Sequence, residues 1–403
     1  MLTHASWRDG LVPLGIWAVF TVLGAVILSV AAARQIAIEH TVPGYTVTAP
    51  MPASPGYFGV VTNWDGNWYR SISEHGYPTV LPVDDHGNVQ QNEWAFYPLY
   101  PLLVRGVMTV TGVGFAHGAW AVSLVFGAAA MVALYNLVRA GMGRFGAAAL
   151  VSCVMAYMSA PVLQVAYTEG LALFLIVAFM AALTRRRLDV AIGVAILVSL
   201  ARPVAAPLGL VMGGVLLLDW LQERRERPAH RLPVKGVAAT VAVFATAGIW
   251  PLIAWATTGS RDAFFQTQAA WPVNSNGLGG WLGDVIHVTP IGLLAIAVVG
   301  FLALVNARPR AHLWGRELQL WSIAYPVFLI VASRPSPSAI RYFMLAVAPL
   351  WPFPGLSLRR TRGSRAAAIA LLIALIATGL GAQYLWTTHV FTVPGTPSQQ
   401  FFP

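Results

Sequence analysis

Charged residues are scarce in this sequence, and cysteine is nearly absent. Only 10% of the 403 residues are Asp, Glu, Lys or Arg, and 57% are apolar, whereas soluble proteins carry about 25% charged residues. A soluble chain is therefore excluded, and a single membrane anchor of about 20 residues does not account for so many apolar positions. The one cysteine, Cys153, excludes an intramolecular disulfide and a cysteine metal cluster. We interpret the chain as an all-α polytopic membrane protein.

Basic residues outnumber acidic residues by 25 to 15, which gives a formal net charge of +10. All of them except Lys235 are arginines, and with the abundant Ala, Gly, Val and Pro this indicates a bacterial chain from a GC-rich genome. The arginines lie in short segments between apolar runs rather than on one soluble face, so they do not indicate nucleic acid. We expect a multi-pass protein of a bacterial plasma membrane, surrounded by membrane lipid and with no nucleic-acid partner.

The distribution of basic residues predicts the orientation of the chain. The first apolar run, 11–33, is too long for the apolar part of a signal peptide, so we expect a retained span with its amino terminus inside. Five basic clusters follow, at 139–144, 185–187, 224–235, 308–316 and 359–365. The positive-inside rule makes all five cytoplasmic.

This orientation predicts about eleven transmembrane helices in a single membrane domain, 1–403. The expected spans are 11–33, 118–138, 145–161, 168–184, 188–204, 205–221, 236–257, 288–306, 317–333, 340–357 and 366–386. A large extracytoplasmic first loop (34–96), a second one (259–287) and a tail (387–403) lie outside. The helical stretch 96–112 is left over, and we expect an interfacial or re-entrant element there.

The first outer loop combines acidic and aromatic residues. Asp65 lies between Trp64 and Trp68, and Glu93 opens a second aromatic stretch. Aromatic rings stack on sugar faces, and partial burial raises the basicity of a carboxylate, so this pattern suits the deprotonation of a sugar hydroxyl. The alternative is that Asp65, which precedes a glycine, only forms a turn.

Two arginines, Arg202 and Arg341, fall at the expected outer ends of spans. An unpaired charge there costs about 2.5 to 3.5 kcal/mol, so an anionic group should compensate each of them. The alternatives are an ion pair with Glu169, the acidic outer loop, or a lipid phosphate at the same depth.

Four short elements keep the order, spacing and side of the membrane of a known family. They are Trp64-Asp65 with Gly76-Tyr77; Glu93 with Ala95-Phe96-Tyr97-Pro98-Leu99-Tyr100-Pro101; Ala166-Tyr167-Thr168-Glu169; and Arg202-Pro203 with Arg341-Tyr342. They resemble the GT-C membrane glycosyltransferases, and within them the PIG-V type, the mannosyltransferase 2 of glycosylphosphatidylinositol synthesis, with its bacterial relatives. The resemblance is dense over 57–174, although Thr168 and Gly170 stand where that family has serines.

The resemblance implies an inverting glycosyltransferase with a GT-C-like fold that acts on the outer side of the membrane. The donor would be a polyprenyl-phosphate sugar, mannose in that family, and the acceptor a glycan or glycolipid. Asp65 would be the catalytic base, Glu93 would orient the acceptor or support Asp65, and Arg202 and Arg341 would bind the donor phosphate. The substrate-binding residues implied are Trp64, Trp68, Tyr69, Tyr97 and Glu169.

The sequence offers little to hold a metal or a nucleotide. No Gly-rich phosphate-binding loop precedes a helix, and a lipid-linked donor needs none. His75, His86 and His287 show no i, i+4 ligand spacing, and we interpret Asp84-Asp85-His86 as a solvated turn. We therefore expect no required cofactor and no protein-bound metal, and we leave open a divalent ion bound through the donor phosphate.

Two other functions share this topology. A lipid or glycolipid transporter or flippase does not need a long acidic and aromatic loop, and such proteins commonly have repeated halves, which this sequence lacks. A non-catalytic membrane assembly partner would have lost the base position, but Asp65 is present.

Overall fold

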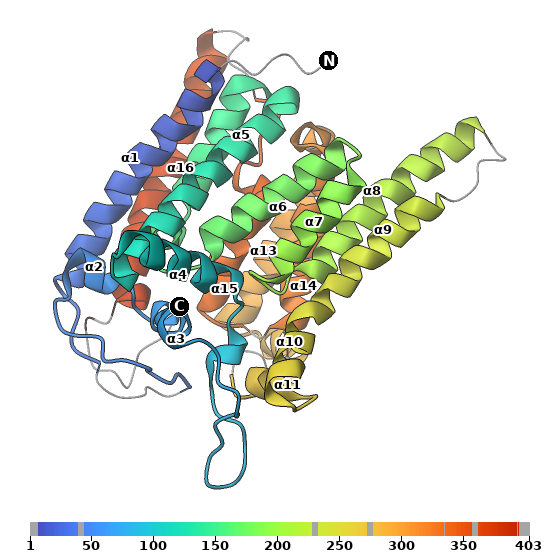
Figure 1. Cartoon of the computed structure of the whole chain (residues 1–403). Coiled ribbons are helices and arrows are strands. Elements are labelled where there is room, and N and C mark those ends of the chain that lie inside the picture. Colours follow the sequence, from blue (N-terminus) through green and yellow to red (C-terminus); the bar gives the residue numbers. More distant parts are fainter. Residues whose placement is uncertain are drawn as a thin grey trace.

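The computed structural model describes residues 7–38, 44–227, 233–271, 277–333, 335–356, 362–392 and 394. Helices form nearly all of the regular structure in these ranges (Figure 1). The only other regular pairings among them are two isolated bridges, between Ile38 and Met51 and between Val83 and Val89. The expected all-α class is therefore confirmed for the described part of the chain.

The long helix α5 (Phe115–Met155) packs against several helices, among them α1 (Trp7–Ala32), α6 (Glu169–Thr184) and α16 (Arg362–Trp386) (Figure 1). The contact between α5 and α6 depends on glycine. A Cβ atom added to Gly170 would lie 3.2 Å from the backbone nitrogen of Gly127. Small residues allow membrane helices to approach this closely.

Helix α5 contains a break where the sequence predicts a cytoplasmic connection. Gly143 has φ 72° and ψ 176°, so the helix is interrupted there, close to the basic residues Arg139 and Arg144. The part after the break ends at Met155, earlier than the expected 161, and a 3₁₀ turn, η2 (Ala160–Gln164), follows.

A second group of helices completes the bundle. It comprises α7 (Leu188–Ser199), α8 (Ala205–Glu226), α9 (Val234–Ala245), α10 (Ile249–Thr258), α12 (Gly277–Ile286), α13 (Pro290–Asn306) and α14 (Arg316–Ala332). Arg186 and Arg316 both pair with Asp219, which joins the turn after α6, helix α8 and the start of α14. Two of the basic clusters thus meet at one end of the bundle.

Five described helices are long and apolar enough to cross a membrane, and the α12–α13 pair, bent by 106°, makes a sixth if it counts as one span. Three more apolar helices are shorter, at 10–17 residues. The chain therefore has five to six candidate spans, which is consistent with a multi-pass membrane protein, and the expected number of eleven is not shown.

The expected span at 340–357 is wrong. The segment forms only the short helix α15 (Ser338–Phe343) and two 3₁₀ turns, η6 (Met344–Ala346) and η7 (Ala348–Leu350). Val347 between the turns has a φ of 42°. Prolines at 349, 352 and 354 lack the N–H groups that a continuous helix requires, so the apolar composition of this segment does not produce a spanning helix.

The segment 44–111 folds into short helices at the opposite end of the bundle from the carboxyl-terminal end of α8 (Figure 1). They are α2 (Gly56–Val60), α3 (Asp65–His75), the 3₁₀ turn η1 (Glu93–Ala95) and α4 (Leu99–Thr111), and α11 (Ala263–Ala269) of the second outer loop lies nearby. The rings of Tyr77, Trp94 and Trp250 pack with centroids 4.7 to 4.9 Å apart and join the first loop to α10.

Helix α4 occupies the stretch 96–112 that was expected to be interfacial or re-entrant. Its 13 residues span about 20 Å, which is too short for a hydrocarbon core about 30 Å thick. Tyr100 and Val104 are buried, whereas Leu102 and Val110 on the other side are 57% and 86% exposed. Helix α4 is therefore too short to span a membrane as a straight helix, and the interfacial or re-entrant placement stays a prediction.

Candidate active site

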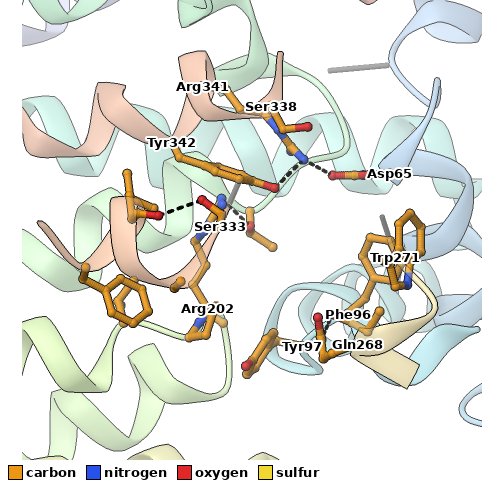
Figure 2. Close-up of a pocket in the computed structure, with 18 of the residues that line it drawn as sticks. Asp65, Phe96, Tyr97, Arg202, Gln268, Trp271, Ser333, Ser338, Arg341 and Tyr342 are labelled. Atoms are coloured by element: carbon orange, nitrogen blue, oxygen red, sulfur yellow. Dashed lines mark hydrogen bonds and ion pairs between the residues drawn. The ribbon is translucent and has the colours of Figure 1, made fainter. Parts of the chain in front are cut away.

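A cavity of about 580 Å³ opens between the two outer loops and the ends of α7, α14 and α15 (Figure 2). Its lining combines charged, aromatic and apolar side chains. The lining residues include Tyr45, Asp65, Tyr69, Phe96, Tyr97, Arg202, Gln268, Trp271, Tyr325, Phe328, Leu329, Ala332, Arg341 and Tyr342.

Asp65 is the first residue of α3, where the positive end of the helix dipole favours a carboxylate. The preceding residue, Trp64, has a φ of 54°, a conformation that costs a non-glycine residue about 1 to 3 kcal/mol. Trp64 is fully buried, and its indole N–H donates to the carbonyl oxygen of Phe391 at 2.7 Å. Tertiary contacts therefore hold the unusual backbone that presents Asp65 to the cavity.

Asp65, Glu169, Arg202 and Arg341 form one ion-pair network. Nη2 of Arg341 lies 2.5 Å from Oδ2 of Asp65, and Nη1 lies 3.2 Å from Oε1 of Glu169. Figure 2 marks the contact between Arg341 and Asp65 with a dashed line. Nη1 of Arg202 lies 2.8 Å from the same oxygen of Glu169. Two of the three expected compensating groups, Glu169 and the acidic outer loop, are thus present, and the network carries two charges of each sign.

Because the ion-pair network is buried, the loss of one of its side chains should destabilise the protein. Glu169 has no exposed surface, and Arg341 and Asp65 are 5% and 8% exposed. Removal of one partner from a buried ion pair leaves an uncompensated charge and typically costs about 3 to 5 kcal/mol. The turn that follows α7 at Ser199 carries Arg202 to the network, so the expected span 188–204 ends early for a structural reason.

Tyrosine rings cover the two guanidinium groups. Cζ of Arg341 lies 4.8 Å from the ring centre of Tyr167 and 4.9 Å from that of Tyr342, and Cζ of Arg202 lies 4.8 Å from Tyr342. The Tyr342 hydroxyl also accepts a hydrogen bond from Nη2 of Arg341 at 3.2 Å. Such cation–π contacts stabilise a desolvated guanidinium by about 2 kcal/mol.

Burial raises the pKa of the Asp65 carboxyl above its ordinary value of 3.8, and the neighbouring guanidinium of Arg341 opposes this rise. A carboxylate with a raised pKa is a stronger base than one in water. Burial and Arg341 therefore act in opposite directions on the proton affinity of Asp65, and its role as a base stays a prediction.

The opposite wall of the cavity is aromatic. Trp271 packs edge-on against Tyr45 and Phe96, with ring centroids 5.5 and 5.6 Å away. Gln268, from the same helix region, donates from Nε2 to the carbonyl oxygen of Ala95 at 3.3 Å. Figure 2 shows Phe96, Tyr97, Gln268 and Trp271 together on the side of the cavity that faces Arg341.

The structure brings most of the expected site residues together. Asp65, Tyr69, Tyr97, Arg202 and Arg341 line the cavity, and Glu169 lies behind its surface against the two arginines.

Trp64, Trp68 and Glu93 are not among the lining residues. Trp68 is buried and stacks on Phe96, so the two tryptophans support the site from behind. Glu93 accepts a hydrogen bond from the hydroxyl of Ser71 at 2.8 Å.

Several lining residues escaped sequence reasoning, among them Tyr45, Phe96, Gln268, Trp271 and Tyr325. A weak signal existed for Trp271, a tryptophan in an outer segment with little charge, but nothing in the sequence indicates that this segment packs against the first loop.

No group of three or more potential metal-ligating side chains occurs within the described ranges. Oδ1 of Asp84 accepts hydrogen bonds from the backbone N–H groups of His86 and Asn88, at 2.9 and 2.8 Å. The interpretation of 84–86 as a solvated turn is confirmed.

No protein-family model and no curated protein sequence matches the chain, but solved structures are similar to it. One is ArnT from Cupriavidus metallidurans bound to undecaprenyl phosphate, with a TM-score of 0.53 and 17% identity, over 92% of this chain and 65% of that one. Another is the apo oligosaccharyltransferase from Archaeoglobus fulgidus, with a TM-score of 0.52 and 12% identity, over 96% of this chain and 57% of that one. A third is the archaeal oligosaccharyltransferase AglB from Archaeoglobus fulgidus in complex with an inhibitory peptide and a dolichol-phosphate, with a TM-score of 0.50 and 11% identity, over 95% of this chain and 56% of that one.

The chain therefore spans less than two thirds of the length of each of these proteins. The expected similarity to GT-C glycosyltransferases extends over most of the chain, at the level of the fold. The PIG-V type is not shown.

Proposed function

We propose that this chain is an inverting glycosyltransferase that moves a sugar from a polyprenyl-phosphate donor to a glycan or glycolipid acceptor. The observation that carries this proposal is the position of Asp65, a carboxylate with a raised pKa, on the wall of a cavity that two arginines also line. The fold similarity to ArnT, whose structure holds undecaprenyl phosphate, and to AglB, whose structure holds a dolichol-phosphate, supports a lipid-phosphate donor.

The proposed reaction is a single in-line displacement. Asp65 removes the proton of the acceptor hydroxyl while that oxygen forms a bond to the anomeric carbon of the donor sugar. The bond between the anomeric carbon and the phosphate oxygen breaks, and the lipid phosphate leaves with the electron pair. Arg202 and Arg341 stabilise the charge on the departing phosphate.

The lining suggests where each substrate lies. Apolar side chains of α14, Phe328, Leu329 and Ala332, continue from the arginines and suit the first isoprene units of the donor. The aromatic wall around Trp271 suits the face of an acceptor sugar.

Mannose is the sugar that the PIG-V resemblance implies, and we retain it as the first donor to test. Purified protein in lipid vesicles, supplied with polyprenyl-phosphate mannose and an extract of membrane glycolipids, should release polyprenyl phosphate in step with a new glycoside. A flippase would move the donor without cleaving it, and an assembly partner would do neither. Parallel reactions with polyprenyl-phosphate glucose and galactose identify the sugar.

We further propose the orientation that the charge rule predicts, with the cavity on the extracytoplasmic side and the eleven-span arrangement modified at 340–357. A cysteine at Asp85, an exposed residue of the first loop, should react with an impermeant thiol reagent added to intact cells. A cysteine at Gln222, exposed near the end of α8, should react only after the cells are opened. Native Cys153 is buried and serves as the internal control. Equal labelling at both positions in intact cells would refute the orientation.

A further inference from the structure

The segment that follows α16 returns to the back of the cavity. The π-helical turn η8 (Thr387–Phe391) is closed by Thr392, whose backbone N–H donates to the carbonyl oxygen of Thr387 at 2.9 Å. Thr387 and Phe391 are 0% and 1% exposed. Single π turns within helical structure are rare and are frequently found at functional sites.

Phe391 contacts two residues that adjoin the Asp65–Arg341 pair, Trp64 beside Asp65 and Tyr167 beside Arg341. Its carbonyl oxygen accepts the indole hydrogen bond of Trp64, the strained residue before Asp65. Its ring lies 5.8 Å from the ring of Tyr167 at an interplanar angle of 66°, and Tyr167 in turn lies under the guanidinium of Arg341. The ring of Trp386 stacks on that of Phe391, with ring centroids 5.7 Å apart.

We infer that Phe391 is a positioning residue that sets the distance between the carboxylate of Asp65 and the guanidinium of Arg341. This inference rests on the proposed function. One contact, with Trp64, holds the backbone that begins α3. The other, with Tyr167, holds the aromatic ring on which the Arg341 guanidinium lies.

The position of Arg341 matters because several charged or titratable groups act on Asp65. Within the described structure they are Arg341 from α15, Glu169 from α6, Arg202 after α7, and the hydroxyls of Tyr45, Tyr69 and Tyr167. Arg341 is the largest of the influences that lower the pKa of Asp65. If the ring of Phe391 is lost, Arg341 moves relative to Asp65, and the pKa of the base should rise.

The test measures glycosyl transfer against pH for Phe391→Ala, Phe391→Leu and Trp64→Phe. We expect kcat to fall about 10- to 100-fold in Phe391→Ala, as misplacement by about 1 Å can cause. The acid limb of kcat/KM should move up by about one pH unit, because a nearby opposite charge lowers a carboxyl pKa by about 1 to 3 units. Phe391→Leu keeps an apolar side chain without the ring, and Trp64→Phe keeps a ring without the donor, so both should fold and move the limb in the same direction.

Phe179→Ala is the matched control, because Phe179 is a fully buried phenylalanine of α6 that does not line the cavity. It should lower thermal stability without moving the acid limb. Trp64→Phe and Phe391→Ala should also be less than additive in kcat when combined. The inference would be overturned if the acid limb of kcat/KM stayed unchanged in Phe391→Ala, Phe391→Leu and Trp64→Phe. It would also be overturned if Phe179→Ala moved the acid limb as far as these variants do. Neither outcome touches the proposed function, which fails only if the unmutated protein transfers no sugar.

Discussion

Asp65→Asn should reduce sugar transfer by a factor of about 10² to 10⁴, the usual effect of the loss of a general base. The amide keeps the shape of the side chain but has no proton affinity. Activity of the unmutated protein should rise as the pH increases through the pKa of Asp65, because only the carboxylate accepts a proton. Since burial raises this pKa, the acid limb should lie above 3.8, and it should be absent from the residual activity of Asp65→Asn.

Asp65→Asn should also destabilise the protein, which an exposed loop position would not predict. Asp65 is buried and paired with Arg341, so its loss leaves a buried guanidinium with only Glu169 to balance it. Thermal unfolding must therefore be measured with activity, at a temperature where the variant is folded. Glu93→Gln is the comparison, because Glu93 bonds Ser71 and does not line the cavity. Normal turnover in Asp65→Asn beside an inactive Glu93→Gln would require the two roles to be exchanged.

Arg341→Lys should lose about 10² to 10³ in kcat although the charge is retained, as the loss of a stabilising donor in a transition state does. Nη1 of Arg341 bonds Glu169, and Nη2 bonds Asp65 and Tyr342. A single ammonium group cannot occupy both positions of the guanidinium fork. Turnover and donor affinity should be measured for Arg341→Lys, Arg341→Ala and Arg202→Ala.

Arg70→Lys is the control for these variants, since Arg70 lies on α3 but is exposed and, within the described part of the chain, pairs locally with Glu74 at 3.1 Å. It should transfer sugar at the unmutated rate. The two carboxylates already balance the two arginines, so charge compensation alone does not require a phosphate here. Full activity with unchanged donor affinity in both Arg341→Ala and Arg202→Ala would therefore remove the arginines from the donor site.

Several site residues can be predicted from the sequence because the signal lies in the residue type and its immediate neighbours. Asp65 stands out as a carboxylate among aromatic residues in an outer segment, and Arg202 and Arg341 stand out as charges at the ends of apolar runs. The cost of charge in a membrane restricts such residues to a few places, so their position along the chain already indicates their depth. All three line the cavity.

Other features depend on contacts between distant segments and have no local signal. The pairing of Asp65 with Arg341 joins residues 276 positions apart, and the bond from Trp64 to Phe391 joins residues 327 apart. The indole of Trp64 points to this carbonyl oxygen rather than into the cavity, whereas Trp271 enters the cavity from a loop that the motifs do not cover.

Apolar composition by itself determined that this chain belongs in a membrane, and charge asymmetry determined the orientation that we propose for it. The tertiary structure decided that 340–357 is not a spanning helix, that Glu169 lies behind the cavity wall between two arginines, and that the carboxyl-terminal turn supports Asp65. Composition indicates whether a segment prefers water or membrane, because the transfer free energies of its residues add up along the segment. The geometry of a site arises from packing among many segments at once, and only the folded chain specifies it.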